Sequence, residues 1–414
     1  MEEWKEYKVA EVIEEISMGP FGSNIKVDIF IDSGIPVLNG SNLQGFKLNE
    51  DSFNYVSQEK ADSLGKANAH KGDVVITHRG TLGQIVYIPE DSKYKQYVIS
   101  QSQFRLKLNQ DLIRPDFFVY FFHTRLGQHR ILMNASQVGV PALARPTSTF
   151  KEVLVPVPSM DVQIKVMDIL HSLDDKIEVN RKINENLEQQ AQALFKSWFV
   201  DFEPFKNGEF VESELGVIPK GWRVGSLSSI ADYINGLAMQ KYRPEEEEKG
   251  LPVLKIKELG QGSVDDNSEL SSPSLIGEKY IINDGDIIFS WSGTLMVKIW
   301  CGGKCGLNQH LFKVVAKDYP KWFAYQWTRH HLDNFIRIAK DKAVTMGHIK
   351  RGELDKAKVL IPDRSSMGIV SDIMKPLHLQ MISNELESRR LAELRDTLLP
   401  KLMSGELNVG DVML

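Results

Sequence analysis

Short polar stretches that contain glycine and lie between β-type runs hold the side chains best suited to recognition chemistry. One such stretch in the first half of the chain carries His78, Arg79 and Thr81. An arginine can pair with guanine through two parallel hydrogen bonds, and nearby glycines let the backbone approach a groove closely. Gln101 and Gln103 flank the start of the next β-type run. Glutamine suits the edge of adenine, and the polar face of a strand explains these two residues equally well.

Two more stretches of the first half could touch a polyanion. Residues 19–24 form a flexible polar loop that contains Ser23 and is followed by Lys26, although a plain turn is as good an explanation. Residues 137–149 combine Arg145 with several hydroxyl groups, which is a composition that can grip phosphate.

The second half of the chain holds counterparts of these candidates. They are Lys255, Lys257, Trp291, Ser292, Thr294 and His310, followed by Thr345, His348, Lys350 and Arg351 in the stretch 345–351. The strongest electrostatic indication is a basic cluster made of Lys340, Lys342, Lys350, Arg351, Lys356 and Lys358. A basic cluster of this kind is typical of nucleic-acid binding, and a solvated charged face is the alternative.

Composition excludes several classes of protein. The chain has 414 residues, of which 42% are hydrophobic and 25% charged, with a net charge of −5. These values indicate an ordinary globular protein with room for two or three domains. We find no apolar run long enough to span a membrane and no signal peptide, so we expect a cytoplasmic protein without a membrane partner.

The sequence contains no pattern that predicts catalysis or a bound metal. No GxxxxGK[ST], GxGxxG, HExxH or GxSxG motif occurs, so we expect no catalytic residue in this chain. Cys301 and Cys305 are the only cysteines, and a zinc site needs further ligands at matching spacing. We therefore interpret them as reduced thiols. The acidic and basic residues around Asp116 and Glu353 are a weak match to a metal-dependent nuclease.

The elements that position the candidates occur twice. GDVVITHRGTL at 72–82 matches GDIIFSWSGTL at 285–295, and IPVL at 35–38 matches LPVL at 251–254. The order of matching segments is kept along the whole chain, which indicates a tandem duplication. The matched positions are framework residues, while the polar residues between them differ.

Each copy ends in a long helical stretch with apolar residues at alternating steps of three and four, a coiled-coil pattern. The seam of the first stretch, 161–199, contains Leu173, Ile177, Asn180, Leu187, Leu194 and Trp198. The seam of the second, 204 residues later, contains Leu377, Met381, Asn384, Leu391, Leu398 and Leu402. A 39-residue helix is roughly 58 Å long and needs a partner, for which the other copy is suited.

The predicted fold is therefore α+β. Two similar mixed α/β domains are joined by two long helices that form an antiparallel coiled coil, as a tandem repeat with pseudo-two-fold symmetry. The predicted parts are 1–158, 159–205, 206–363 and 364–414, with a linker at 200–222. We expect Asp161 and Ser365 to cap the long helices, and Pro400 to kink or end the second one.

Three segments resemble a known family. LFKSWFVDF at 194–202, GVIPKGW at 216–222 and LLPKLMSGEL at 398–407 are similar to segments of the specificity (S, HsdS) subunits of type I restriction–modification enzymes. The resemblance implies that the domains are target-recognition domains, each of which reads one half of a bipartite double-stranded DNA target. It also implies that the helices set the spacing and dock modification (methyltransferase) and restriction (endonuclease/translocase) subunits. S-adenosylmethionine, ATP and Mg are then expected in those partners, with no cofactor in this chain. A non-catalytic scaffold that binds proteins through its coiled-coil rod is the alternative.

Overall fold

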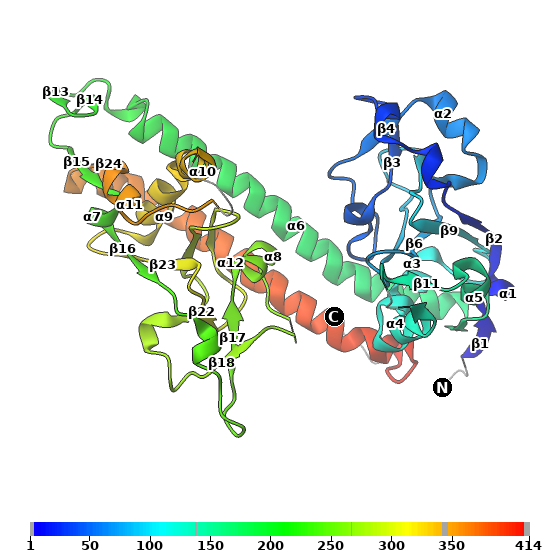
Figure 1. Cartoon of the computed structure of the whole chain (residues 1–414). Helices are drawn as coiled ribbons and strands as arrows, with labels where there is room; N and C mark the ends of the chain where they lie inside the picture. Colours follow the sequence, from blue (N-terminus) through cyan, green and yellow to red (C-terminus); the bar gives the residue numbers. More distant parts are fainter. Residues whose placement is uncertain (1–3, 137–138, 266, 342–346, 410–414) are drawn as a thin grey trace. The chain divides into compact units, whose positions relative to one another are not determined.

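The computed structural model describes residues 4–136, 139–265, 267–341 and 347–409, except for the side chain of Ser23. The chain divides into two compact units, Met1–Asp175 with Ala392–Leu414, and Lys176–Leu391. Each unit contains one mixed α/β domain and part of both long helices (Figure 1). The predicted α+β class is confirmed.

The first domain is built on two four-stranded sheets. One is antiparallel throughout, in the order β2 (Ile13–Met18), β9 (Gln103–Leu108), β6 (Val74–Thr77), β7 (Ile85–Tyr87). The other has a parallel β3–β8 pair at its centre, in the order β4 (Asn54–Val56), β3 (Ile35–Val37), β8 (Gln96–Val98), β5 (Asn68–His70). Two-stranded pairs join β1 (Lys5–Lys8) to β12 (Leu154–Val157) and β10 (Ala135–Ser136) to β11 (Ala142–Leu143). The helices are α1 (Val9–Val12), α2 (Gln58–Ser63), α3 (Pro115–His123), α4 (Arg125–Leu132), α5 (Pro146–Lys151) and the 3-10 turns η1 (Gly22–Asn24), η2 (Val27–Ile29), η3 (Gly40–Leu43) and η4 (Gly65–Ala67).

The second domain repeats the two four-stranded sheets and the pair formed by the first and last strands. Its antiparallel sheet has the order β16 (Ala231–Asn235), β23 (Leu311–Ala316), β20 (Ile287–Ser290), β21 (Met296–Ile299). Its mixed sheet has the order β18 (Leu270–Ser271), β17 (Leu251–Leu254), β22 (Cys305–Leu307), β19 (Ile281–Ile282), again with the parallel pair at the centre. The pair β15 (Arg223–Ser226) and β24 (Lys358–Ile361) matches β1 and β12. The helices are α7 (Leu227–Ile230), α8 (Ile256–Gln261), α9 (Lys321–His330), α10 (Leu332–Asp341), α11 (Gly352–Lys356) and the turns η5 (Glu203–Phe205), η6 (Met239–Lys241) and η7 (Glu278–Tyr280). The duplication is thus confirmed.

Three segments differ in detail from the structure expected from the sequence. The predicted linker contains a hairpin of β13 (Phe210–Ser213) and β14 (Gly216–Pro219). The predicted helical patch 115–132 is two helices, because the Thr124 hydroxyl accepts a hydrogen bond from Gly127 N (3.0 Å) and caps α4. The α9–α10 segment is likewise divided, at His331.

The long helices are α6 (Met160–Phe199) and α12 (Arg364–Met403), the two longest ribbons in Figure 1. All twelve predicted seam residues are buried or half-buried. In the second unit, Asn180 Nδ2 donates to Glu387 Oε2 (2.8 Å), and Asn184 Nδ2 donates to Met381 O (3.0 Å). The partner number falls as the α6 number rises, so the helices are antiparallel there.

Asparagines form a polar layer in this seam. Asn384 Nδ2 donates to Asn184 Oδ1 (2.9 Å), and Asn180 Nδ2 lies 3.4 Å from the Asn384 carbonyl oxygen. Asn180 and Asn384 therefore lie next to each other, which the sequence alone did not predict. Buried seam asparagines favour one register because a slipped register leaves their amides without partners.

The predicted helix caps were wrong by a few residues. Asp161 and Ser365 lie in the first turns, after helix starts at Met160 and Arg364. Asp363 is the cap of α12, since its Oδ1 accepts from the backbone N–H groups of Ser365 (2.9 Å) and Ser366 (3.0 Å). These hydrogen bonds, that of Ser366 N–H first, lower the pKa of Asp363. Pro400 does not end α12, which continues to Met403.

The last part of α12 belongs to the core of the first unit. Leu399, Leu402 and Met403 are buried in the cluster that holds Phe117 and Val166. Beyond the helix, a β-carbon at Gly405 would lie 3.1 Å from the Trp4 ring. The beginning and the end of the described chain therefore lie against each other.

Candidate nucleic-acid interface

Four candidate stretches of the first domain meet where β6 ends and β9 begins. Three main-chain hydrogen bonds hold them together: Gly19 N to Gln103 O (2.8 Å), His78 N to Ser102 O (2.9 Å) and Gly80 N to Pro141 O (2.8 Å). The structure thus brings together the loops at 19–24, 78–81, 100–103 and 139–145. We call this assembly of loops the first loop cluster.

The second domain has the same frame. Its equivalent hydrogen bonds are Gly236 N to Leu311 O (3.0 Å), Trp291 N to His310 O (3.4 Å) and Gly293 N to Gly347 O (3.0 Å). We call the loops joined by these bonds the second loop cluster. A β-carbon would lie 1.9 Å from Ser100 O at Gly19 and 2.2 Å from Asn308 O at Gly236. Glycine is required at both places because the loop backbones approach each other so closely.

Most predicted side chains of the first loop cluster point to solvent. Lys26, Arg79, Thr81, Gln101 and Arg145 are exposed. Arg145 also adopts left-handed backbone angles (φ 46°, ψ 59°) just before α5, which an arginine adopts only at some cost in free energy. An arginine fixed in this way projects from a defined point of the surface.

His78 is the half-buried member of the first loop cluster. Its Nε2 lies 3.2 Å from the carbonyl oxygen of Gln101. Burial lowers the pKa of His78 below its ordinary value of 6.5. The ring is therefore neutral near pH 7 and is suited to a hydrogen bond with a base edge rather than to an ion pair with phosphate.

Gln103 is not a surface contact. Only 1% of the residue is exposed, and its Oε1 accepts a hydrogen bond from Ser100 N (2.8 Å). The side chain closes the turn 100–103 from inside. This corrects both its interpretation as a reader of adenine and the alternative of a polar strand face.

In the second loop cluster, aromatic and imidazole rings take the places of the charged groups. Trp291 Nε1 donates to Asn235 Oδ1 (3.0 Å). Ser292 is buried, and its hydroxyl lies 3.0 Å from Nδ1 of His310, so it supports that ring instead of facing solvent. Asn235 is a further candidate residue that the sequence did not single out, and its place at the end of β16 could have indicated it.

The other predicted residues around the second loop cluster differ in their exposure and in their partners. Thr294, His348 and Lys350 are exposed, and Arg351 donates to the carbonyl oxygen of Tyr233 (3.1 Å). The cluster of six predicted from the sequence is partly neutralised, because Lys358 pairs with Glu214 (2.9 Å). The predictions at Thr345, Lys342 and the side chain of Ser23 lie outside the described residues.

The start of α8 lies beside the second loop cluster. A β-carbon at Gly293 would lie 3.5 Å from Cδ1 of Ile256, between the two predicted lysines. Lys255 pairs with Glu269 (2.8 Å) and Lys257 with Asp265 (3.4 Å). Both lysines therefore lie close enough to the second loop cluster to contact the same ligand, and each is paired with an acidic side chain.

An ion pair supports each antiparallel sheet, buried in the first domain and half-buried in the second, and neither pair was predicted from the sequence. Arg105 NH1 lies 3.2 Å from Asp73 Oδ2 in the first domain, and Lys313 Nζ lies 2.8 Å from Asp286 Oδ2 in the second. The repeated Gly-Asp pair at 72–73 and 285–286 was the available signal. Breaking a buried pair leaves one charge without a partner, which is strongly destabilising.

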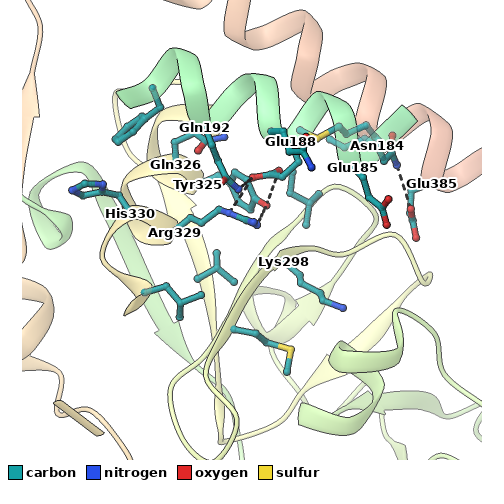
Figure 2. Close-up of a pocket in the computed structure, with 18 of the residues that line it drawn as sticks. Asn184, Glu185, Glu188, Gln192, Lys298, Tyr325, Gln326, Arg329, His330 and Glu385 are labelled. Atoms are coloured by element: carbon teal, nitrogen blue, oxygen red, sulfur yellow. Dashed lines mark hydrogen bonds and ion pairs between the residues drawn. The ribbon is translucent and has the colours of Figure 1, made fainter. Parts of the chain in front are cut away.

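The second unit also contains an open groove of ≈ 1080 Å³ between α6, α9 and β21 (Figure 2). Glu188 lines this groove and accepts from Arg329 Nε (3.0 Å) and from the Tyr325 hydroxyl (3.3 Å). The equivalent tyrosine of the first unit, Tyr120, is instead covered by Phe46, with ring centroids 4.0 Å apart. Four acidic and four basic side chains line the groove, so it has no preference for one sign of charge: Glu185, Glu188, Asp333 and Glu385 against Arg181, Lys196, Lys298 and Arg329.

The thiols and the metal-ligating residues indicate no further chemistry. Burial raises the pKa of Cys301 and of Cys305 to about 12, so both thiols are protonated and unreactive near pH 7. Within the described ranges, no three His, Cys, Asp or Glu residues come close enough to hold a metal ion. None of the helices in the described part of the chain is long and apolar enough to cross a membrane.

Comparison with known proteins identifies the family. The family model of the type I restriction modification DNA specificity domain matches residues 1–189 and 219–395. The chain therefore belongs to this family, and it is a non-catalytic specificity subunit of the type I restriction–modification class.

Full-length relatives agree with this assignment. The MjaIX specificity subunit of Methanocaldococcus jannaschii is 27% identical over 432 residues, which cover 99% of this chain and 95% of the relative. The HindI specificity subunit of Haemophilus influenzae is 24% identical over 476 residues, which cover 98% and 100%. Among solved structures, the type I S subunit from M. genitalium has a TM-score of 0.52 at 15% identity and covers 97% of this chain and 96% of its own. That structural likeness concerns the fold.

Proposed function

We propose that each loop cluster reads one half of a bipartite, double-stranded DNA target. The observation that carries this proposal is that the two loop clusters have matching main-chain hydrogen bonds but different side chains. Arg79 stands where the second domain has Ser292, and His78 stands where it has Trp291. Two domains that shared one base sequence would need the same donors and acceptors at these positions.

Different residues are suited to reading bases and to binding phosphates. Arg79 and Gln101 present groups that suit guanine and adenine in the major groove. Lys26 and Arg145 in the first domain, and Lys350 in the second, are placed to neutralise phosphates, which positions the protein without reading sequence. A net charge of −5 is compatible with this because the basic groups are local.

The long helices complete the proposed function. Their antiparallel seam sets the spacing of the half-sites and docks the modification and restriction subunits. S-adenosylmethionine, ATP and Mg bind in those partner subunits, so that methyl transfer and cleavage occur there. The role of this chain is to choose the DNA sequence at which they act.

Domain exchange tests the proposal. Residues up to about Val155 are replaced by the first recognition domain of a related subunit, and the methylated sites of the host are sequenced. We expect one half of the target to change and the other half to stay the same, because each domain has its own sheets and core. A folded hybrid that alters both halves would contradict independent reading.

Salt dependence distinguishes this function from a protein-binding scaffold. Neutralised phosphates release counterions, so specific DNA affinity must fall steeply as salt rises. A scaffold that recognises only proteins would show no difference between target and non-target DNA at any salt concentration.

A further inference from the structure

An aromatic ring stands almost free in solvent at the edge of the first loop cluster. Phe21 is 84% exposed, although phenylalanine belongs to the residues most often buried. It is the most exposed of the large hydrophobic side chains in the described part of the chain, together with Val27. The ring contributes little to the stability of its own domain.

The loop that carries Phe21 is firmly attached. Gly19 N donates to Gln103 O (2.8 Å), and Asn24 N donates to the carbonyl oxygen of Phe21 (2.8 Å). After the loop, Ile25 and Ile29 pack against the core cluster that contains Val37 and Val98. The exposed ring is thus held in place by a backbone that is fixed on both sides.

The neighbours of Phe21 are the candidate base-reading groups. A β-carbon at Gly22 would lie 2.0 Å from Oε1 of Gln101, so the loop lies directly on that side chain. Lys26, which is exposed, follows five residues later. A DNA groove that meets Gln101 would meet the ring at the same time.

We propose that Phe21 makes an apolar contact with the 5-methyl group of a thymine in the first half-site. This inference rests on the proposed DNA-reading function and adds one specificity-determining residue to it. The thymine methyl is the apolar group that the major groove presents, and phenylalanine is among the side chains that contact it. The neighbouring glutamine suits the same groove.

Phe21 acts only in the first domain. The residue at the equivalent distance from Gly236 is Ala238, and Met239 after it is buried. Because the position equivalent to Phe21 holds an alanine, we expect F21A to leave recognition of the second half-site unchanged, so that half-site serves as an internal control.

Deoxyuridine provides the test, since it lacks only the methyl group of thymine. Each thymine of both half-sites is replaced in turn, and the dissociation constant of the full chain with its modification subunits is measured. We expect one replacement in the first half-site to weaken binding about fourfold, as the loss of one buried methyl group predicts. F21A should weaken binding to thymine-containing DNA, and it should show no further loss with deoxyuridine at that position.

Two controls make the result interpretable. F21A should unfold at the same temperature as the unmodified chain, because its ring is exposed. L275A removes a 58% exposed apolar side chain from the other domain and should leave the first half-site unaffected.

Three results would overturn the inference. The first is a first half-site without any thymine whose methyl group matters. The second is independent, additive losses from F21A and deoxyuridine. The third is an F21A chain that fails to bind the modification subunits, since the ring would then be a protein contact. If the unmodified chain itself does not distinguish target from non-target DNA, the proposed function has failed as well.

Discussion

Arg79 and Ser292 show how one backbone position can serve two recognition tasks. Each residue forms an isolated antiparallel bridge with the segment after the short helices, Arg79 with Ala142 and Ser292 with His348. Arg79 is exposed, whereas Ser292 is buried against His310. The first loop cluster therefore presents a long cation at a place where the second presents a supported imidazole.

If Arg79 reads a base, R79A should weaken binding to the target by about 1–3 kcal/mol and relax a single position of one half-site. R79K keeps the charge and loses the two-bond geometry, so it should recover little of the specificity. Binding to a set of targets with one base changed at a time provides the measurement. K26A is the matched control, and we expect it to weaken all of these DNAs equally. The same uniform loss in R79A would place Arg79 on phosphate.

For individual residues, the sequence predicted the right stretches but not the placement of every side chain. The glycines and polar residues at 78–81 and 291–294 were sufficient to find the loops. Gln103 was misplaced because its side chain folds back on Ser100 N, a turn contact that no periodicity reports. Phe21 was passed over because apolar residues are expected inside, and only the folded loop shows its exposure.

Among the helices, the contact of α9 with α12 contains a buried histidine. His378 on α12 is 6% exposed, and its Nε2 lies 3.2 Å from Nε2 of Gln326 on α9. Burial, assisted by repulsion from Arg329, lowers the pKa of His378 to about 4. The histidine is therefore neutral in the folded protein at every pH near neutrality.

Acid should loosen this contact. The unfolded chain binds a proton at His378 near the ordinary pKa of 6.5, while the folded chain binds it only near 4. The associated stability is present above pH 6.5 and is lost as the pH falls toward 4. Between pH 7 and pH 5 we expect the unmodified chain to lose roughly 2 kcal/mol more than H378Q, measured by urea unfolding. H129Q, at an exposed histidine, is the control. Equal pH dependence in H378Q and the unmodified chain would refute this prediction.

The elements themselves were largely predictable. Both long helices follow from periodicity, because each buries a regular face. The strands at 103–108 and 74–77 follow from their β-type composition and the turn residues around them. The helix caps were not predictable, since Asp363 and Ser365 are equally suitable residues and only the hydrogen bonds of the folded chain show that Asp363 caps α12. The hairpin at 210–219 also escaped prediction, because glycine and proline mark turns and linkers alike.

In the whole molecule, we expect the length of the long helices to determine the spacing between the two half-sites. Four residues inserted near Asn184 lengthen α6 by about 6 Å, close to two base-pair steps of ~3.4 Å. They also rotate the following part by about 40° beyond a full turn, which a seam can absorb as a stutter. A matched insertion near Ser388 in α12 keeps the two helices equal in length.

We expect the double insertion to lengthen the preferred spacer while the half-site sequences stay unchanged. Binding or methylation across a DNA series that varies only the spacer gives the readout. Each single insertion should have a smaller effect, because the unaltered helix resists it. A folded double variant with the original spacer would show that the helices do not determine the spacing.

Trp4 and Gly405 lie close together in the first unit, where a β-carbon at Gly405 would come within 3.1 Å of the Trp4 ring. Chain segments whose ends lie close together are suited to circular permutation. A short peptide can join the two ends, and new ends can be opened between Asn207 and Gly208, which are exposed and lie outside the sheets. We expect this circular permutant to fold and to bind the same target with a similar dissociation constant. Loss of folding would mean that the order of synthesis matters. If the permutant binds as expected, the order in which the four segments follow one another along the chain does not determine the fold or the target.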